Sequence, residues 1–223
     1  MKKDIPAYKG TLRDHSLSVP DCIYECSGIL IFGRRIKSLV FSTDVAIIKN
    51  INTDAVIAVY PFTPQPAIAQ AIINVSDVPV FVGVGGGITS GERSVRLAAY
   101  AEHQGAFGVV VNAPIPIDVI TDIKAHLDIP VVATIVSEDQ DIDQRIRAGA
   151  DILNVSAAAN TPAVVASIRA RYPDIPIIAT GGPTDESIRA TIAAGANAIT
   201  YTPPTNGELF AIAMQHYREK YKK

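Results

Sequence analysis

An internal repeat constrains the fold of this chain more than any other feature. Asp128–Thr134 reads Asp-Ile-Pro-Val-Val-Ala-Thr, and Asp174–Thr180 reads Asp-Ile-Pro-Ile-Ile-Ala-Thr, at an offset of 46 residues. Ala148–Asp151 recurs with one change at Ala194–Asn197, at the same offset. A period of this length accommodates two consecutive strand–helix units. The repeat therefore predicts a chain built from copies of one βαβα unit.

Short apolar runs alternate with longer helical patterns from residue 38 onward. The runs are continuous rather than alternating, which is typical of parallel strands covered on both faces. Between them lie segments of helical periodicity, such as Ile117, Ile120 and Ile123. The eight runs are Ser38–Ser42, Ala55–Val59, Val80–Val84, Gly108–Val111, Val131–Ile135, Ile152–Val155, Ile177–Ala179 and Ala198–Tyr201. Eight such units predict an α/β fold, a single closed (β/α)8 TIM barrel over residues 38–223.

Three glycines recur at the ends of predicted helices. Gly105, Gly149 and Gly195 each precede a strand by two or three residues. This is the position where a helix commonly ends in the left-handed conformation, which glycine adopts without strain.

Residues 1–37 lie outside the repeat. Gly28–Gly33 predicts a strand, and Arg34-Arg35 predicts a turn towards the first barrel strand. We expect this N-terminal segment to close the bottom of the barrel. The alternative is an arm that reaches a neighbouring subunit.

Composition excludes several classes of protein. The formal net charge is −2 and no block of five like charges occurs, so we expect no nucleic-acid partner. No run reaches the roughly 18 apolar residues of a membrane span, and no apolar run follows Lys2 and Lys3, so we expect neither a membrane span nor a signal peptide. Cys22 and Cys26 are the only cysteines and predict reduced thiols in a cytoplasmic protein, with a disulfide or redox pair as the alternative.

Polar side chains follow most of the predicted strands. In barrels of this kind the active site lies at the carboxyl ends of the strands. None of the four histidines and no lysine ends a strand, so a Schiff-base mechanism lacks its amine. Hydroxyl and amide groups bind polar ligands but do not transfer protons near pH 7. The candidate ligand-binding residues here are Asn112, Thr134, Asn154, Ser156, Thr180, Thr202 and Thr205.

Few charged side chains lie close to the strand ends. Asp44 is the first candidate for a general base or a Mg²⁺ ligand, and Glu138 is the second catalytic candidate. Each has a structural alternative, because Asp44 can cap Val45–Lys49 and Glu138 opens a helical pattern. Arg93 is the best-placed cation for an anionic ligand, with a solvated surface arginine as the alternative.

A run of three glycines follows the third strand. Gly85, Gly86 and Gly87 are costly in entropy and predict close approach of the backbone to a ligand, or a loop that moves. A tight turn before the helix near Ser90 is the alternative.

The last two units resemble the phosphate-binding TIM-barrel superfamily of epimerases, aldolases and synthases. The resemblance rests on Ala179-Thr180-Gly181-Gly182, followed by a helix and Ala194-Gly195-Ala196, and is clearest over about half the chain. It implies phosphate binding by backbone N–H groups at Gly181 and Gly182. The chain departs from the pattern after the eighth strand, where Pro203-Pro204 removes two donors. Thr202, Thr205 and the following N–H groups could form a substitute cradle.

These observations predict an enzyme that acts on a small polar or phosphorylated metabolite. We expect a lyase, isomerase or hydrolase with an anionic or polar ligand, with Mg²⁺ as the candidate cofactor and without FMN. A non-catalytic metabolite sensor, similar to antiterminator barrels, is the first alternative, and a flavin-dependent barrel is the second. Barrels of this size commonly self-associate, so a homo-oligomer is expected.

Overall fold

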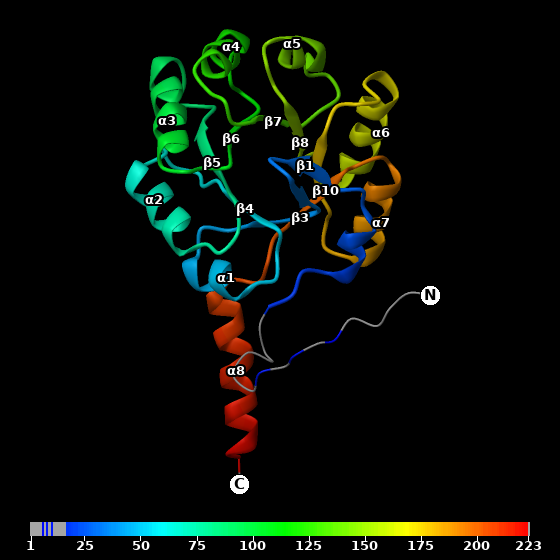
Figure 1. Cartoon of the computed structure of the whole chain (residues 1–223). Helices are drawn as coiled ribbons and strands as arrows, with labels where there is room; N and C mark the ends of the chain where they lie inside the picture. Colours follow the sequence, from blue (N-terminus) through cyan, green and yellow to red (C-terminus); the bar gives the residue numbers. More distant parts are fainter. Residues whose placement is uncertain (1–5, 7, 9, 11–16, 223) are drawn as a thin grey trace.

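Eight parallel strands form a closed barrel in the computed structural model, which describes residues 6, 8, 10 and 17–222 (Figure 1). The order around the barrel is β10-β3-β4-β5-β6-β7-β8-β9, so neighbours in sequence are neighbours in space and β10 closes on β3. The predicted TIM barrel is confirmed. Its strands are β3 (Ser38–Phe41), β4 (Ala55–Ala58), β5 (Val80–Gly85), β6 (Gly108–Val111), β7 (Val131–Ile135), β8 (Ile152–Val155), β9 (Ile177–Thr180) and β10 (Ala198–Tyr201).

A helix follows each barrel strand, and all of these helices except α8 pack against the outer faces of the strands. They are α1 (Val45–Asn50), α2 (Pro66–Val75), α3 (Glu92–His103), α4 (Ile117–Ala125), α5 (Ile142–Arg147), α6 (Thr161–Arg171), α7 (Asp185–Ala193) and α8 (Asn206–Lys220), with the short 3-10 turns η1 (Asp21–Glu25) and η2 (Ala158–Asn160). Gly105, Gly149 and Gly195 have φ values of 92°, 108° and 111°, which confirms their role just past the helix ends. No helix among the described residues is long and apolar enough to cross a membrane.

The helix predicted to open at Ser137-Glu138-Asp139 begins later. Ser137 and Gln140 form a turn, in which the Gln140 N–H donates to the Ser137 carbonyl at 3.4 Å. The Asp141 carboxylate then accepts from the Gln144 N–H at 2.9 Å and caps α5. The prediction for this helix start was therefore wrong by a few residues, because Asp141 satisfies the N-terminal donors instead of Ser137.

The segment predicted as one strand over Gly28–Gly33 is a hairpin. β1 (Ile29–Ile31) pairs antiparallel with β2 (Arg34–Ile36). Phe32 and Gly33 have positive φ values of 45° and 78°, which turns the chain back within two residues. Arg34-Arg35 consequently belongs to the second strand and not to a turn, so that prediction was wrong.

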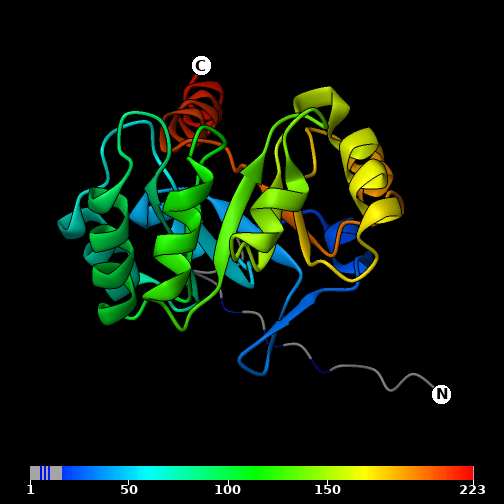
Figure 2. The same ribbon diagram turned by 90° about the horizontal axis from the view of Figure 1, so that it is seen from above.

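The hairpin closes the amino end of the barrel (Figure 2). Ile29, Ile31 and Ile36 are buried and pack with the inward-facing residues of the barrel strands, Phe81 among them. Phe32 adds an edge-to-face contact with Phe107 at 5.4 Å between ring centroids. The predicted closure of the barrel bottom is confirmed for the described part of residues 1–37, and most of residues 1–16 lie outside it.

The outer wall beside α7 is covered by η1, and α8 stands away from the barrel (Figure 1). Arg189 of α7 donates to Glu25 of η1 at 3.2 Å. Cys22 and Cys26 are buried there as free thiols, as predicted. No residue of α8 is buried, and Phe210 and Ile212 are 67 % and 66 % exposed.

Candidate functional site

A cavity of about 280 Å³ lies at the carboxyl end of the barrel interior. Its floor is apolar, with Ile57 and Val110 above the packed interior layers. Its upper wall is a ring of hydroxyl and amide groups. We call it the mouth cavity; its lining residues are Phe41, Ile57, Val59, Val110, Asn112, Thr134, Asn154, Ser156, Thr180, Thr200 and Thr202.

Two polar atoms of the mouth cavity are buried and make no hydrogen bond to any described residue: Thr200 Oγ1 and Asn154 Oδ1. The Asn154 amide nitrogen donates to Thr134 Oγ1 at 3.4 Å, which leaves the amide oxygen as a free acceptor. Thr200 is only 7 % exposed. Buried polar atoms are normally hydrogen-bonded, so these two atoms have unused hydrogen-bonding capacity.

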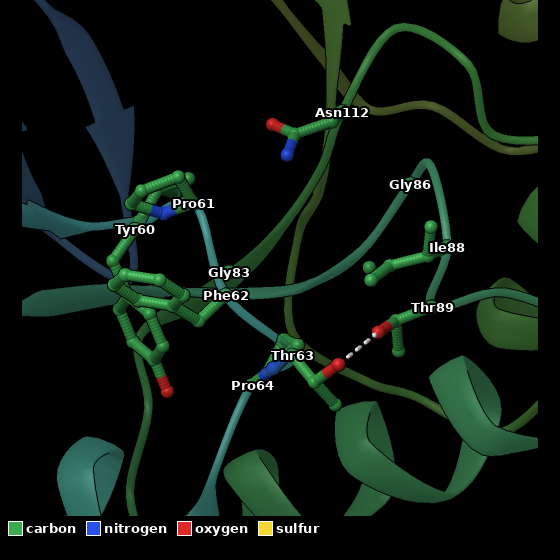
Figure 3. Close-up of a pocket in the computed structure, with 12 residues that line it drawn as sticks. Tyr60, Pro61, Phe62, Thr63, Pro64, Gly83, Gly86, Ile88, Thr89 and Asn112 are labelled. Atoms are coloured by element: carbon green, nitrogen blue, oxygen red, sulfur yellow. Dashed lines mark hydrogen bonds between the residues drawn. The ribbon is translucent and has the colours of Figure 1, made fainter.

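A second cavity of about 310 Å³ adjoins the mouth cavity and shares Val59 and Asn112 with it. Its walls come from the loops after β4 and β5, which a hydrogen bond of 3.2 Å joins from Thr89 Oγ1 to Thr63 Oγ1 (Figure 3). In Figure 3, Ile88 and Asn112 point into the same space, which Tyr60 and Phe62 bound on the other side. Phe62 and Ile88 are 72 % and 95 % exposed, so two apolar side chains flank an open entrance.

The glycine run shapes this second cavity. A Cβ on Gly86 would lie 2.6 Å from Asn112 Cβ and 2.8 Å from Asn112 N, and one on Gly85 would overlap Ser94 Oγ. The loop therefore packs directly against β6 and α3, which a side chain would prevent. Gly87 has open space around it but a φ of +85°. Gly85 and Gly86 line the cavity, whereas Gly87 is exposed at the loop tip.

A third and larger cavity of about 1560 Å³ opens from the mouth cavity between the ends of β9 and β10 and the start of α8. We call it the β9–β10 cleft. It shares Ser156, Thr180, Thr200 and Thr202 with the mouth cavity. Six predicted binding residues line it: Ser156, Thr180, Gly181, Gly182, Thr202 and Thr205.

The predicted catalytic carboxylates lie outside these three cavities. Asp44 Oδ1 accepts from the backbone N–H groups of Ala46 and Ile47 at 2.9 and 3.3 Å and so caps α1. Its other oxygen, Oδ2, accepts from Asn206 Nδ2 at 2.7 Å. Glu138 is exposed in the turn before α5.

Arg93 also lies away from the mouth. It is exposed in the first turn of α3 and lines an outer groove with Pro66, Arg96 and Tyr100. This groove shares no lining residue with the mouth cavity, the second cavity or the β9–β10 cleft.

Several lining residues are not among the predicted binding residues. Thr200 lies at the end of the predicted strand Ala198–Tyr201 but is not in that set, although it pairs in register with Thr180 across the β9–β10 ladder. Glu208 belongs to a Thr-x-x-Glu capping box that begins at Thr205, a pattern visible in the sequence but ordinarily structural. The apolar walls Phe41, Val59, Tyr60 and Phe62 carry no chemical signal of their own.

The side chains at the mouth cavity do not fit a magnesium site, which would need carboxylate ligands. Mg²⁺ is bound mainly through carboxylates and water. The mouth cavity offers neutral hydroxyl and amide groups, and both oxygens of Asp44 are engaged. Among the residues the structure describes, no three His, Cys, Asp or Glu side chains are placed to share a metal ion.

Comparison with known proteins supports the fold. No family model matches the chain, and no curated protein matches it either. Solved structures do match: 2,3-dimethylmalate lyase, a PEP mutase/isocitrate lyase superfamily member, is 15 % identical, with a TM-score of 0.65 over 90 % of this chain and 82 % of that one. Phosphonopyruvate hydrolase in complex with oxalate and Mg²⁺ is 14 % identical, with a TM-score of 0.60 over 83 % and 80 %. The 4-hydroxy-tetrahydrodipicolinate synthase of Methylacidiphilum fumariolicum SolV is 12 % identical, with a TM-score of 0.60 over 74 % and 67 %. At these identities the likeness identifies the chain as a TIM-barrel protein.

Proposed function

We propose that this protein is an enzyme that binds a small polar metabolite in the mouth cavity. The observation that carries the proposal is the pair of buried, unpartnered polar atoms, Thr200 Oγ1 and Asn154 Oδ1, above an apolar floor. A cavity of this chemistry binds an organic ligand through its apolar body and fixes its orientation by a few polar contacts. The location agrees with the general position of active sites in this fold.

The reaction class we propose is a lyase, isomerase or hydrolase. Two of the similar structures are, by name, a lyase and a hydrolase, which supports this class without assigning a reaction. Asp44 and Glu138 stay our candidates for proton transfer. Asp44 is the better placed, because its hydrogen-bond partner Asn206 directly follows Thr205, a cleft residue.

The loops after β4 and β5 are proposed to shield the bound ligand from water. Phe62 and Ile88 expose apolar side chains on the two sides of the entrance. Movement of the glycine loop that carries Ile88 would bring the two side chains closer. Such movement is proposed for the exposed tip at Gly87 and Ile88, because Gly85 and Gly86 pack against Ser94 and Asn112.

A non-catalytic metabolite sensor is the second candidate. One observation favours it: the described residues that line the three cavities include no His or Lys, and Glu208 is their one carboxylate. A site with so few titratable groups is suited to binding more than to proton transfer.

Binding and turnover measured together separate the two. We would screen small polar metabolites by thermal shift, then follow each hit by NMR for conversion. Thr200→Val and Asn154→Leu should each weaken binding of a hit by about tenfold, the loss of one good hydrogen bond. Conversion that both variants lose supports the enzyme, and tight binding without conversion supports the sensor. Binding that neither variant weakens would refute a site in the mouth cavity.

A further inference from the structure

The β9–β10 cleft is the place where a phosphate would be expected, but the charged side chains around it are acidic and would repel a phosphate. Two helices begin at its edge, α7 and α8, and helix N-termini normally attract anions. The described residues that line the cleft include no Lys, Arg or His, and they do include Glu208. Asp185 and Glu186 add two further acids in the first turn of α7.

Both helices carry carboxylates in their first turn. Glu208 Oε2 accepts from the Thr205 backbone N–H at 2.7 Å and from the Thr205 hydroxyl at 2.8 Å. These bonds lower the pKa of Glu208, so it is ionised at neutral pH. The pKa of Glu186 is lowered by its own backbone N–H and by the Thr184 hydroxyl. Each helix therefore carries negative charge in its first turn, and Glu208 places one of these charges in the lining of the cleft.

Backbone donors are also scarce around the cleft. Pro183, Pro203 and Pro204 have no N–H. The Gly181 N–H donates to the Thr200 carbonyl at 3.3 Å, and the Ser187 N–H donates to Thr184 Oγ1 at 3.2 Å. Of the two donors that the resemblance to phosphate-binding barrels implied, the Gly181 N–H is thus in use, and the Gly182 N–H is the one that remains.

The mouth cavity favours a ligand that donates hydrogen bonds. Asn154 Oδ1 is a buried acceptor without a partner among the described residues, so it requires a hydroxyl or N–H group on the ligand. An ionised carboxylate or a phosphate-ester dianion offers only acceptors and would face this oxygen unfavourably. Thr200 Oγ1 can donate to or accept from the same ligand.

We infer that the ligand of the site proposed above is an uncharged hydroxyl- or amide-bearing compound that carries no phosphate or other anionic group. The inference rests on the proposed function and narrows its substrate class. It separates this chain from its structural neighbours, one of which was crystallised with oxalate and Mg²⁺.

Matched pairs of probes test the inference. The full-length protein is titrated with inorganic phosphate, ribose 5-phosphate and ribose, and glycerol 3-phosphate and glycerol, with thermal shift and ligand-observed NMR as readouts. We expect no saturable binding of phosphate or of either ester. Glu208→Lys should raise the affinity for inorganic phosphate by about tenfold or more over the wild type, because it reverses the charge of the cleft. Glu219→Lys, the same change at the distal end of α8, should not.

The outcomes are decisive in either direction. Saturable binding of phosphate or an ester to the wild type that Thr200→Val weakens would overturn the inference while leaving a ligand site in the mouth cavity. Lack of any gain in Glu208→Lys would also overturn it, since the local charge would then not control anion binding. Absence of phosphate binding in the wild type, with a gain in Glu208→Lys alone, supports the inference. Failure of the proposed function itself is a different result, namely binding of a neutral ligand that Thr200→Val and Asn154→Leu leave unchanged.

Discussion

Asp44 and Asn206, which are far apart in sequence, meet at the rim of the barrel. The Asn206 side-chain amide donates to Asp44 Oδ2 at 2.7 Å, while Asp44 Oδ1 caps α1. One carboxylate thus joins the end of β3 to the first residue of α8, next to the β9–β10 cleft. This bond gives Asp44 a structural role that the sequence offered only as the alternative to catalysis.

Substitution of Asp44 separates these roles. Asp44→Ala should destabilise the protein by about 1 kcal/mol through loss of the cap, a fall in Tm of about 2–4 °C. Asp44→Asn should keep the cap, because Asn is equally favourable at this position. Thermal unfolding of the two variants measures the difference. Equal Tm values would contradict the capping role, whereas loss of turnover in Asp44→Asn at unchanged Tm would assign Asp44 as the base.

Removal of the Thr200 hydroxyl should not destabilise the fold. Because Thr200 Oγ1 is buried without a partner among the described residues, Thr200→Val should leave the free energy of unfolding unchanged or raise it. The control is Thr53→Val, since the buried Thr53 hydroxyl donates to the Ala55 carbonyl at 2.9 Å. That variant should lose about 1 kcal/mol. Urea unfolding compares the two, and a larger loss at Thr200 would refute its assignment as a ligand group.

Substitution by alanine should destabilise the protein by different amounts at two neighbouring glycines. Gly86→Ala forces a Cβ to within 2.6–2.9 Å of Asn112 and should cost roughly 3 kcal/mol. Gly87→Ala meets no atom within 4 Å and should cost only the strain of its positive φ, about 1 kcal/mol. Chemical denaturation gives both values. The reverse order would mean that the loop does not pack on Asn112 in solution.

Acid should weaken the start of α8 through Glu208. Its folded-state pKa lies below the ordinary value of 4.5, because the Thr205 N–H and hydroxyl stabilise the carboxylate. The resulting stability is present above pH 4.5 and is lost as the pH falls through the lower folded-state pKa. Glu208→Gln keeps a capping side chain but does not titrate, so its Tm should fall less steeply below pH 4.5 than that of the wild type. Identical pH profiles of Tm would show that this carboxylate is not held by Thr205.

Helix α8 should pair with a second copy of the chain. A helix of 15 residues is marginal in water on its own, and Phe210, Met214 and Tyr217 form an exposed apolar stripe along it. Ala211 and Ile212 lie on another face of the helix and line the β9–β10 cleft. We expect light scattering to give a mass above the monomer for the wild type and a monomer for Phe210→Ser/Tyr217→Ser, with the barrel Tm retained. A monomeric wild type would contradict the predicted homo-oligomer.

Most of the correct predictions of the fold and of the binding residues came from the internal repeat and from the polar residues at the strand ends. Six of the predicted binding residues, from Asn112 to Thr202, line the mouth cavity, because strands of equal direction bring their carboxyl ends to one rim. Arg93, Glu138 and Asp44 were harder to place. Their positions depend on how far each loop runs before its helix begins and on which side chain takes the cap, and neither is encoded by periodicity.

Local periodicity and backbone preference were enough to predict the barrel, the order of its strands and the helix ends at Gly105, Gly149 and Gly195. The polar atoms that lack partners could be identified only from the three-dimensional packing. Thr134, Thr180 and Thr200 look alike in sequence, yet Thr134 and Thr180 have hydrogen-bond partners in the described structure and Thr200 has none. Whether a hydroxyl group finds a hydrogen-bond partner depends on contacts between strands and loops that are distant in the chain. These contacts determine the chemistry of the site.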